Sequence, residues 1–200
     1  MPFGLTNAPS TFQATMNQLF GSYLYKFVIV FFDDILIYSK NLTDHLEHLT
    51  VALCCLRDNQ FFVKLSKCSF CQSSIEYLGH IVSAGAVHAD PKKIETMLQW
   101  PPPTTVKQLC GFLGLTDYYR HFVVGYASIV APLTDLLRRD AFTWSPAANS
   151  SFTTLKHAMV KAPVLALPDF SKEFVIETDA SNDGIGVILM QQGHPIAYFS

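Results

Sequence analysis

The chain has 200 residues, of which 50% are hydrophobic and 15% are charged, and its formal net charge is -2. This composition is typical of a globular protein and excludes a disordered chain. No apolar run reaches membrane-spanning length without a charge, and no secretory signal is recognisable, so we expect an intracellular protein. The five cysteines are irregularly spaced, which indicates reduced thiols, and the Cys68-x-x-Cys71 pair lacks the second pair of ligands that zinc needs.

Charge is unevenly distributed along the sequence. Residues 1–90 carry 5 Lys and Arg against 7 Asp and Glu, residues 91–168 carry 8 against 4, and residues 169–200 carry 1 against 5. A basic middle between acidic ends suits a chain that binds phosphate centrally and metal ions at its ends. Ordinary surface variation explains the same pattern.

The first part of the sequence predicts two helices and two pairs of strands. The first helix is expected within residues 7–24, where apolar residues recur at helical spacing. Residues 27–39, FVIVFFDDILIYS, predict a β-hairpin with an Asp-Asp turn. The second helix is expected over residues 43–60, and a further pair of strands over residues 61–70 and 75–83.

The second predicted helix has a capping box and an apolar stripe. Asp44 followed by Glu47 fits the capping pattern. Four leucines recur at helical spacing and predict the face of this helix that packs on the core: Leu46, Leu49, Leu53 and Leu56.

The second part of the sequence predicts three helices followed by three strands. A short helix begins at Pro91 and ends before the prolines at 101–103, and a longer one covers residues 106–123 with Thr105 and Gln108 as its capping box. A third helix is expected to begin at residue 150 and to end before Pro163. The strands are expected in the tail, in the segments EFVIETDAS, VILMQQG and PIAYFS.

Asp33 and Asp34 stand between two apolar strand segments. Adjacent carboxylates repel each other unless a group of opposite charge compensates them, and a divalent cation does so directly. Magnesium prefers hard oxygen ligands and combines one or two carboxylates with substrate phosphates, as in two-metal phosphoryl transfer. The alternative is a solvated turn, which the apolar flanks make less favourable.

At this point the sequence resembles reverse transcriptases, in particular the Pol polyproteins of gypsy-class LTR retrotransposons. The segment MPFGLTNAPSTFQ resembles the family motif around the incoming nucleotide, FFDD resembles its Tyr-x-Asp-Asp box, and YLGHIVS resembles the segment leading into the primer grip. The segment LQWPPPTTVKQLCGFLGLTDYYRHFV resembles the thumb and connection, and LKHAMVKAPVLALPDFSKEFVIETDAS the start of the RNase H-like domain. These motifs cover essentially the whole chain in the family's order.

The resemblance implies an α+β fold with three parts. These are a partial reverse-transcriptase palm in residues 1–90, a helical thumb and connection in residues 91–165, and a truncated RNase H-like sheet in residues 166–200. It also implies an RNA-directed DNA polymerase with RNase H, using Mg2+, an RNA or DNA primer-template and deoxynucleotide triphosphates. The remainder of a Pol polyprotein, with protease and integrase, is the expected partner. The expected location is a cytoplasmic particle or the nucleus, without a membrane.

The resemblance assigns roles to eleven residues. The catalytic, metal-binding carboxylates are Asp33, Asp34 and Asp179. The nucleotide-binding residues are Phe3, Gly4, Phe32 and Lys67. The nucleic-acid-binding residues are Gln13, Gly79, His80 and Arg120. Several of them have plain alternatives: a surface helix residue for Gln13, a surface lysine for Lys67, and a structural histidine for His80.

The sequence also departs from the family pattern. Phe31 stands where the family usually has tyrosine, so a hydroxyl is missing beside the aspartates. The family uses three palm carboxylates and four RNase H carboxylates, of which two and one are matched here. We therefore expect a slice of a longer polyprotein with little or no activity by itself. The alternative is a catalytically inactive relic or a domesticated module that binds nucleic acid or protein.

Overall fold

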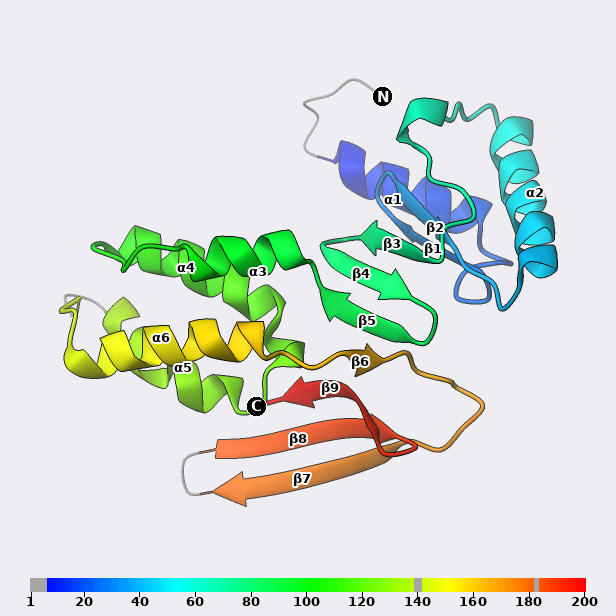
Figure 1. Cartoon of the computed structure of the whole chain (residues 1–200). Helices are drawn as coiled ribbons and strands as arrows, with labels where there is room; N and C mark the ends of the chain where they lie inside the picture. Colours follow the sequence, from blue (N-terminus) through cyan, green and yellow to red (C-terminus); the bar gives the residue numbers. More distant parts are fainter. Residues whose placement is uncertain (1–6, 139–141, 182–183) are drawn as a thin grey trace. The chain divides into compact units, whose positions relative to one another are not determined.

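The computed structural model describes residues 7–138, 142–181 and 184–200, and it has the α+β architecture that the sequence predicts (Figure 1). The chain divides into two compact units, Met1–Ser73 and Ser74–Ser200, each with its own hydrophobic core. The predicted division at residues 90 and 165 follows the family pattern and stays a prediction. The predicted Phe3 and Gly4 lie outside the described residues.

The first unit combines two helices and a hairpin. Its elements are α1 (Ala8–Leu19), β1 (Val28–Phe31), β2 (Asp34–Ile37), α2 (Leu42–Asp58) and the short 3-10 helix η1 (Leu65–Lys67). Both helices contact the hairpin, α1 through β1 and α2 through β2. The buried side chains of this core are Met16, Phe20, Val28, Val30, Ala52 and Leu56.

The predicted hairpin is present, but its turn lies one residue earlier than expected. Phe31 pairs with Asp34, so the two-residue turn is Phe32-Asp33 and Asp34 is the first residue of β2. Phe32 has a φ of 49°, which is unusual for a bulky side chain. The core takes the alternate positions Val28 and Val30, so Phe31 and Asp34 lie on the other face of the hairpin.

Three expectations for the first unit are wrong in detail. The N-cap of α2 is Asn41, whose side chain accepts a hydrogen bond from the Asp44 amide, so Asp44 lies inside the helix. Two of the four predicted stripe leucines, Leu46 and Leu53, are exposed, because α2 turns Ala52 and Leu56 towards the core. Residues 61–70 form no strand, since local backbone bonds make the η1 turn instead.

The second unit contains a four-stranded antiparallel sheet. Its order is β3 (Ser74–Tyr77), β4 (His80–Ser83), β5 (Ala86–Ala89) and β6 (Leu165–Ala166). The single strand expected over residues 75–83 is two strands, because Leu78 and Gly79 have positive φ values of 50° and 73° and reverse the chain. The last strand, β6, joins the sheet from far along the sequence.

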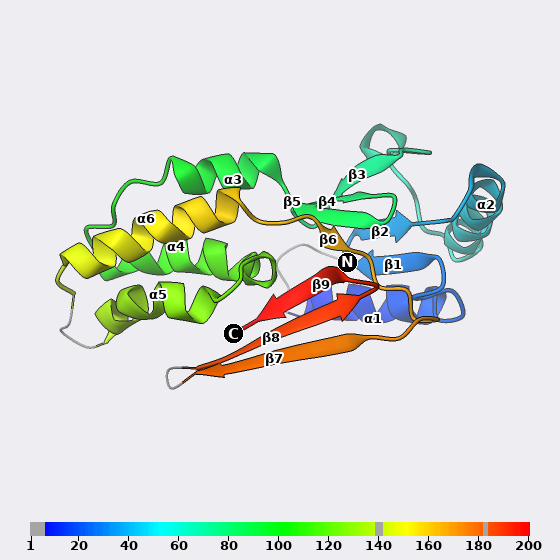
Figure 2. The same cartoon turned by 60° about the horizontal axis from the view of Figure 1, so that its bottom comes forward.

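Four helices pack beside this sheet (Figures 1 and 2). They are α3 (Pro91–Leu98), α4 (Val106–Tyr118), α5 (Tyr126–Thr134) and α6 (Pro146–Val160), with the 3-10 helices η2 (Arg120–Phe122) and η3 (Asp135–Leu137) between them. The predicted cap of α4 is confirmed, because Thr105 accepts from the Gln108 amide. The helix α3 also has a cap that was not predicted, Asp90, which accepts from the Lys92 amide. None of the helices within the described ranges is long and apolar enough to cross a membrane.

Two predictions about these helices need correction. The helix expected over residues 106–123 ends at Tyr118, and the chain continues as η2. The helix α5 was not predicted, because it is short, apolar on most sides and contains Pro132. In the shared core α6 contacts α3 and α5, and Phe112 of α4 packs against Phe152 of α6 with ring centroids 4.6 Å apart.

The three strands predicted in the tail are confirmed. They are β7 (Val175–Ser181), β8 (Gly184–Gln191) and β9 (His194–Phe199), which form an antiparallel sheet in that order. The side chain of Gln191, which is buried, bonds the backbone of Asp169 in both directions and so holds the preceding loop to β8. The last strand, β9, contacts β6 and η2.

Candidate catalytic hairpin and nucleic-acid interface

The tip of the β1–β2 hairpin carries the paired aspartates. Asp33 lies in the turn and Asp34 begins β2, and both side chains are exposed. Phe31 and Phe32 directly precede them, with ring centroids 4.7 Å apart in an edge-on arrangement. The hairpin therefore presents two carboxylates and two aromatic rings at one accessible point.

The side chain of Gln13 on α1 forms hydrogen bonds with the backbone of this hairpin tip. Its amide nitrogen donates to the Val30 carbonyl oxygen at 3.1 Å, and its amide oxygen accepts a hydrogen bond from the Phe32 backbone amide. The same nitrogen lies 2.8 Å from the side-chain oxygen of Asn17. The Gln13 side chain is thus bonded to the hairpin backbone and is only partly exposed, so Gln13 is not a plain surface residue of the helix.

The base of the hairpin has a second anchor that the sequence analysis missed. The Ser39 hydroxyl lies 2.7 Å from Nδ1 of His48 and 3.3 Å from Nδ1 of His45, both on α2. The His48 ring also stacks on Phe27, just before β1, with centroids 3.9 Å apart. The available signal was the spacing of the two histidines, three residues apart on a predicted helix.

The hairpin offers two hard oxygen donors for a divalent cation. Carboxylate oxygens are suitable ligands for Mg2+, which completes its shell with water and phosphate oxygens. Within the part of the chain that the structure describes, no group of three or more His, Cys, Asp or Glu side chains gathers to hold a metal. The chemistry of Asp33 and Asp34 suits a divalent cation, and the hairpin supplies these two carboxylates.

Lys67 and Asp179 belong to other elements than the hairpin. Lys67 ends η1, and its side chain is exposed. Asp179 is exposed on β7, opposite Gly186 of β8, on the same face of the strand as Glu177. All five cysteines are free, as expected.

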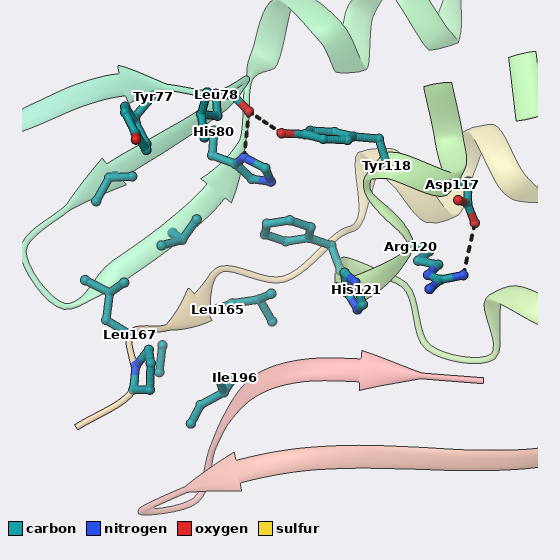
Figure 3. Close-up of a pocket in the computed structure, with 15 residues that line it drawn as sticks. Tyr77, Leu78, His80, Asp117, Tyr118, Arg120, His121, Leu165, Leu167 and Ile196 are labelled. Carbon is teal, nitrogen blue, oxygen red and sulfur yellow. Dashed lines mark hydrogen bonds and ion pairs between the residues drawn. The ribbon is translucent and has the colours of Figure 1, made fainter. Parts of the chain in front are cut away.

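The β3–β4 turn meets the end of α4 (Figure 3). The Tyr118 hydroxyl donates to the Leu78 carbonyl oxygen at 2.6 Å, and the Tyr119 hydroxyl donates to the Gly79 carbonyl oxygen at 2.7 Å. The His80 ring lies among the rings of Tyr118, Tyr119 and Phe122. Burial in this aromatic cluster lowers the pKa of His80.

A cavity of about 580 Å³ opens below this turn, a size that small-molecule sites commonly have. Apolar side chains of β4, β5, β6 and β9 line much of it, and His80, His121 and Arg120 add polar groups (Figure 3). Arg120 lies 3.4 Å from Asp117 and sits over the Phe199 ring at 5.9 Å. The fold thus brings the predicted residues His80 and Arg120 to one cavity.

The comparisons with known proteins agree with this fold and these motifs. Residues 1–82 match the family described as reverse transcriptase (RNA-dependent DNA polymerase). Residues 144–200 match the RNase H-like domain found in reverse transcriptase. The sequence therefore combines the two domain families of a reverse transcriptase with its attached RNase H-like domain.

Relatives over the whole chain are retrotransposon polyproteins. The chain is 41% identical over 202 residues to the retrovirus-related Pol polyprotein from transposon 297 of Drosophila melanogaster, and 36% identical over 213 residues to that from transposon gypsy of the same organism. It is 33% identical over 206 residues to the transposon Tf2-3 polyprotein of Schizosaccharomyces pombe. This chain belongs to the reverse transcriptase and RNase H region of gypsy-class LTR retrotransposon Pol polyproteins.

The matched region is a small part of these relatives. The alignments cover 100% of this chain but 19%, 21% and 16% of the three polyproteins, so the chain spans about a fifth of their length. Among solved structures, the foamy viral protease-reverse transcriptase dRH in complex with ds DNA matches with a TM-score of 0.89 and 23% identity, over 99% of this chain and 36% of that chain. The same viral protein in complex with RNA/DNA hybrid matches with a TM-score of 0.86, 23% identity and 27% of its chain covered. At this identity the likeness supports the fold.

Proposed function

We propose that this chain supplies the metal-binding hairpin, the thumb and the start of the RNase H-like domain of a working reverse transcriptase. In the complete Pol polyprotein, with its protease and integrase, it serves the Mg2+-dependent addition of deoxynucleotides to a primer on an RNA or DNA template. The observation that carries the proposal is the exposed Asp33-Asp34 pair, held by Gln13, in a chain of this family. Phe3, Gly4 and Lys67 are proposed to contact the nucleotide.

The chemical contribution of the hairpin follows from its charges and rigidity. Asp33 and Asp34 would hold divalent cations for the reaction at the primer end, and the ordered turn fixes the position of the two carboxylates. The metal, when bound, neutralises phosphate charge and favours the ionised form of the attacking hydroxyl. Phe32 packs beside the primer and the nucleotide. Asp179 plays the corresponding metal-binding part in the RNase H-like domain.

Nucleic-acid contact is proposed for the surface around the β3–β4 turn. The similar viral structures hold double-stranded DNA and an RNA/DNA hybrid. Gly79 is partly exposed at the turn, while His80 and Arg120 provide polar groups within the same unit. Phosphate contacts of this kind weaken steeply as salt concentration rises.

A segment exchange tests the proposed activity. The 200 residues replace the matching segment of the transposon 297 polyprotein, and primer extension on an RNA template is measured with Mg2+. Extension is expected with the wild-type segment and a loss of at least about a hundredfold with Asp33→Asn or Asp34→Asn. Asp58→Asn, an exposed carboxylate on α2, is the matched control and should extend normally. A well-folded exchange protein without extension contradicts the proposal.

The isolated chain is expected to bind a primer-template but not to extend it. Its described residues gather two adjacent palm carboxylates and no larger acidic cluster. This observation favours the second candidate, a binding module without catalysis, for the chain on its own. Clear Mg2+-dependent extension by the purified 200-residue chain would contradict that expectation.

A further inference from the structure

The β3–β4 turn has an unfavourable local sequence for its shape. A two-residue hairpin turn with positive φ at both positions favours Asn-Gly, because asparagine and glycine tolerate the left-handed region. Here Leu78 occupies the first position with φ 50°, and Gly79 the second with φ 73°. A leucine does not favour this conformation, so contacts from elsewhere must hold the turn.

Those contacts come from two neighbouring tyrosines 40 residues away in the sequence. The Leu78 carbonyl accepts from the Tyr118 hydroxyl at 2.6 Å and lies 2.9 Å from Nδ1 of His80. The Gly79 carbonyl accepts from the Tyr119 hydroxyl at 2.7 Å and from the Asp90 amide at 3.1 Å. Both carbonyls of the turn are therefore fixed on the side of α4.

The close approach of the Tyr119 hydroxyl also explains why position 79 has no side chain. A Cβ atom at Gly79 would lie 2.9 Å from the Tyr119 hydroxyl oxygen, closer than such atoms approach in real structures. Burial, with smaller effects from Tyr118 and Asp90, raises the pKa of Tyr119 to about 12, so its hydroxyl remains a donor at neutral pH.

The two tyrosines differ in burial, so the effect of a hydroxyl on the turn can be distinguished from the effect of a ring on core packing. Tyr119 is 1% exposed and belongs to the hydrophobic core. Tyr118 is 51% exposed, so its ring adds little to the core while its hydroxyl still bonds the turn. The rings meet edge-on with centroids 5.0 Å apart, and their hydroxyls bond the carbonyls of the adjacent residues Leu78 and Gly79.

We propose that Tyr118 and Tyr119 are positioning residues that lock the Leu78-Gly79 turn to the end of α4, so that the turn meets the nucleic-acid backbone in one orientation. The inference rests on the proposed binding of a primer-template by this surface. It adds a defined link between the helix α4 and the turn, made by hydroxyl groups that have no other role in the proposed reaction.

The experiment removes the two hydroxyls and keeps the rings. The 200-residue chain is prepared as wild type, Tyr118→Phe, Tyr119→Phe and the double variant, with the 82%-exposed Tyr25→Phe as matched control. Hydrogen exchange of residues 74–83 reports on the turn, fluorescence anisotropy with a labelled primer-template duplex gives Kd, and thermal unfolding gives Tm. For the double variant we expect roughly tenfold faster turn exchange and roughly tenfold weaker binding. Tyr118→Phe should change both while leaving Tm nearly unchanged.

A rescue variant distinguishes positioning from a general loss of stability. Leu78→Asn, added to the double variant, gives the turn the Asn-Gly sequence that it favours, and should restore most of the duplex affinity. Wild-type turn exchange or wild-type affinity in the double variant overturns the inference. If the wild-type chain itself fails to bind the duplex, the proposed function of this surface is wrong, whereas the turn exchange still shows whether the tyrosines hold the turn.

Discussion

The backbone amide of Phe32 donates a hydrogen bond to the side-chain oxygen of Gln13, which lies 19 residues earlier on α1. Together with the bond from Gln13 to the Val30 carbonyl, it ties the turn that carries Asp33 to a helix that packs in the core. The turn would otherwise be free to reorder, because Phe32 has a positive φ that its side chain disfavours. A helix residue thus sets the geometry of the candidate metal site.

Gln13→Ala is expected to loosen the hairpin more than it unfolds the chain. The loss of two hydrogen bonds at a partly exposed site should lower the free energy of unfolding by about 1 kcal/mol. In the segment-exchange polymerase we expect a larger relative loss, of roughly tenfold in primer extension. Thermal unfolding and extension rates measure the two effects.

Gln18→Ala, on an exposed position of the same helix, is the matched control and should change neither quantity. Gln13→Glu keeps the acceptor for the Phe32 amide but cannot donate to Val30, so it should fall between wild type and Gln13→Ala. Equal extension by Gln13→Ala and wild type would show that the hairpin does not depend on this residue.

Gly79→Ala and Gly85→Ala form a matched pair. Both glycines have positive φ, of 73° and 76°, so an alanine at either position costs about 1 kcal/mol of backbone strain. Only at Gly79 does the added methyl meet another group, the Tyr119 hydroxyl at 2.9 Å, whereas Gly85 has nothing within 4 Å. We expect Gly79→Ala to lower Tm clearly more than Gly85→Ala in thermal unfolding. Equal losses would show that the hydroxyl moves away at no cost.

The stability of the second unit should fall in mild acid because of His80. Burial lowers the pKa of His80 in the folded chain below its ordinary value of 6.5. The unfolded chain therefore takes up a proton at a higher pH than the folded chain does. The contribution of neutral His80 to the free energy of unfolding is complete above pH 6.5. It is lost as the pH falls from there through the pKa of His80 in the folded chain, and the free energy of unfolding changes by at most about 1.4 kcal/mol per pH unit.

Unfolding of wild type and His80→Gln between pH 7.5 and pH 5 measures this effect. The wild type should lose more stability on acidification than His80→Gln, which lacks the titrating ring. His194→Gln, at an exposed position of β9, is the control and should follow the wild type. Parallel curves for wild type and His80→Gln would contradict the prediction.

Lys156 of α6 bonds backbone carbonyls at the end of α3. Its ammonium group donates to the Leu98 carbonyl at 2.9 Å and to the Trp100 carbonyl, and lies 4.4 Å from the Phe152 ring centre. Lys156→Met keeps the apolar stem but removes these bonds, so it should lower the free energy of unfolding by about 1–2 kcal/mol. Lys161→Met, exposed at the end of the same helix, should change it little. Similar Tm values for the two variants would mean that the cap contributes nothing measurable.

Local patterns in the sequence determined much of the fold and pointed to the aspartates. The apolar runs around Asp33 and Asp34 predicted the hairpin, Pro91 and Thr105 predicted two helix starts, and the tail predicted three strands. These features depend on residues a few positions apart, which the sequence places together by itself.

Tertiary packing decided how the candidate sites are held. The turn shifted to Phe32-Asp33, Gln13 bonded the hairpin rather than solvent, and Tyr118 reached Leu78 across 40 residues. No periodicity encodes such pairs, because they form only when separate elements pack and their polar groups find the nearest partners. The sequence by itself pointed to Asp33 and Asp34 as the candidate metal ligands, and the tertiary structure decided which residues position them.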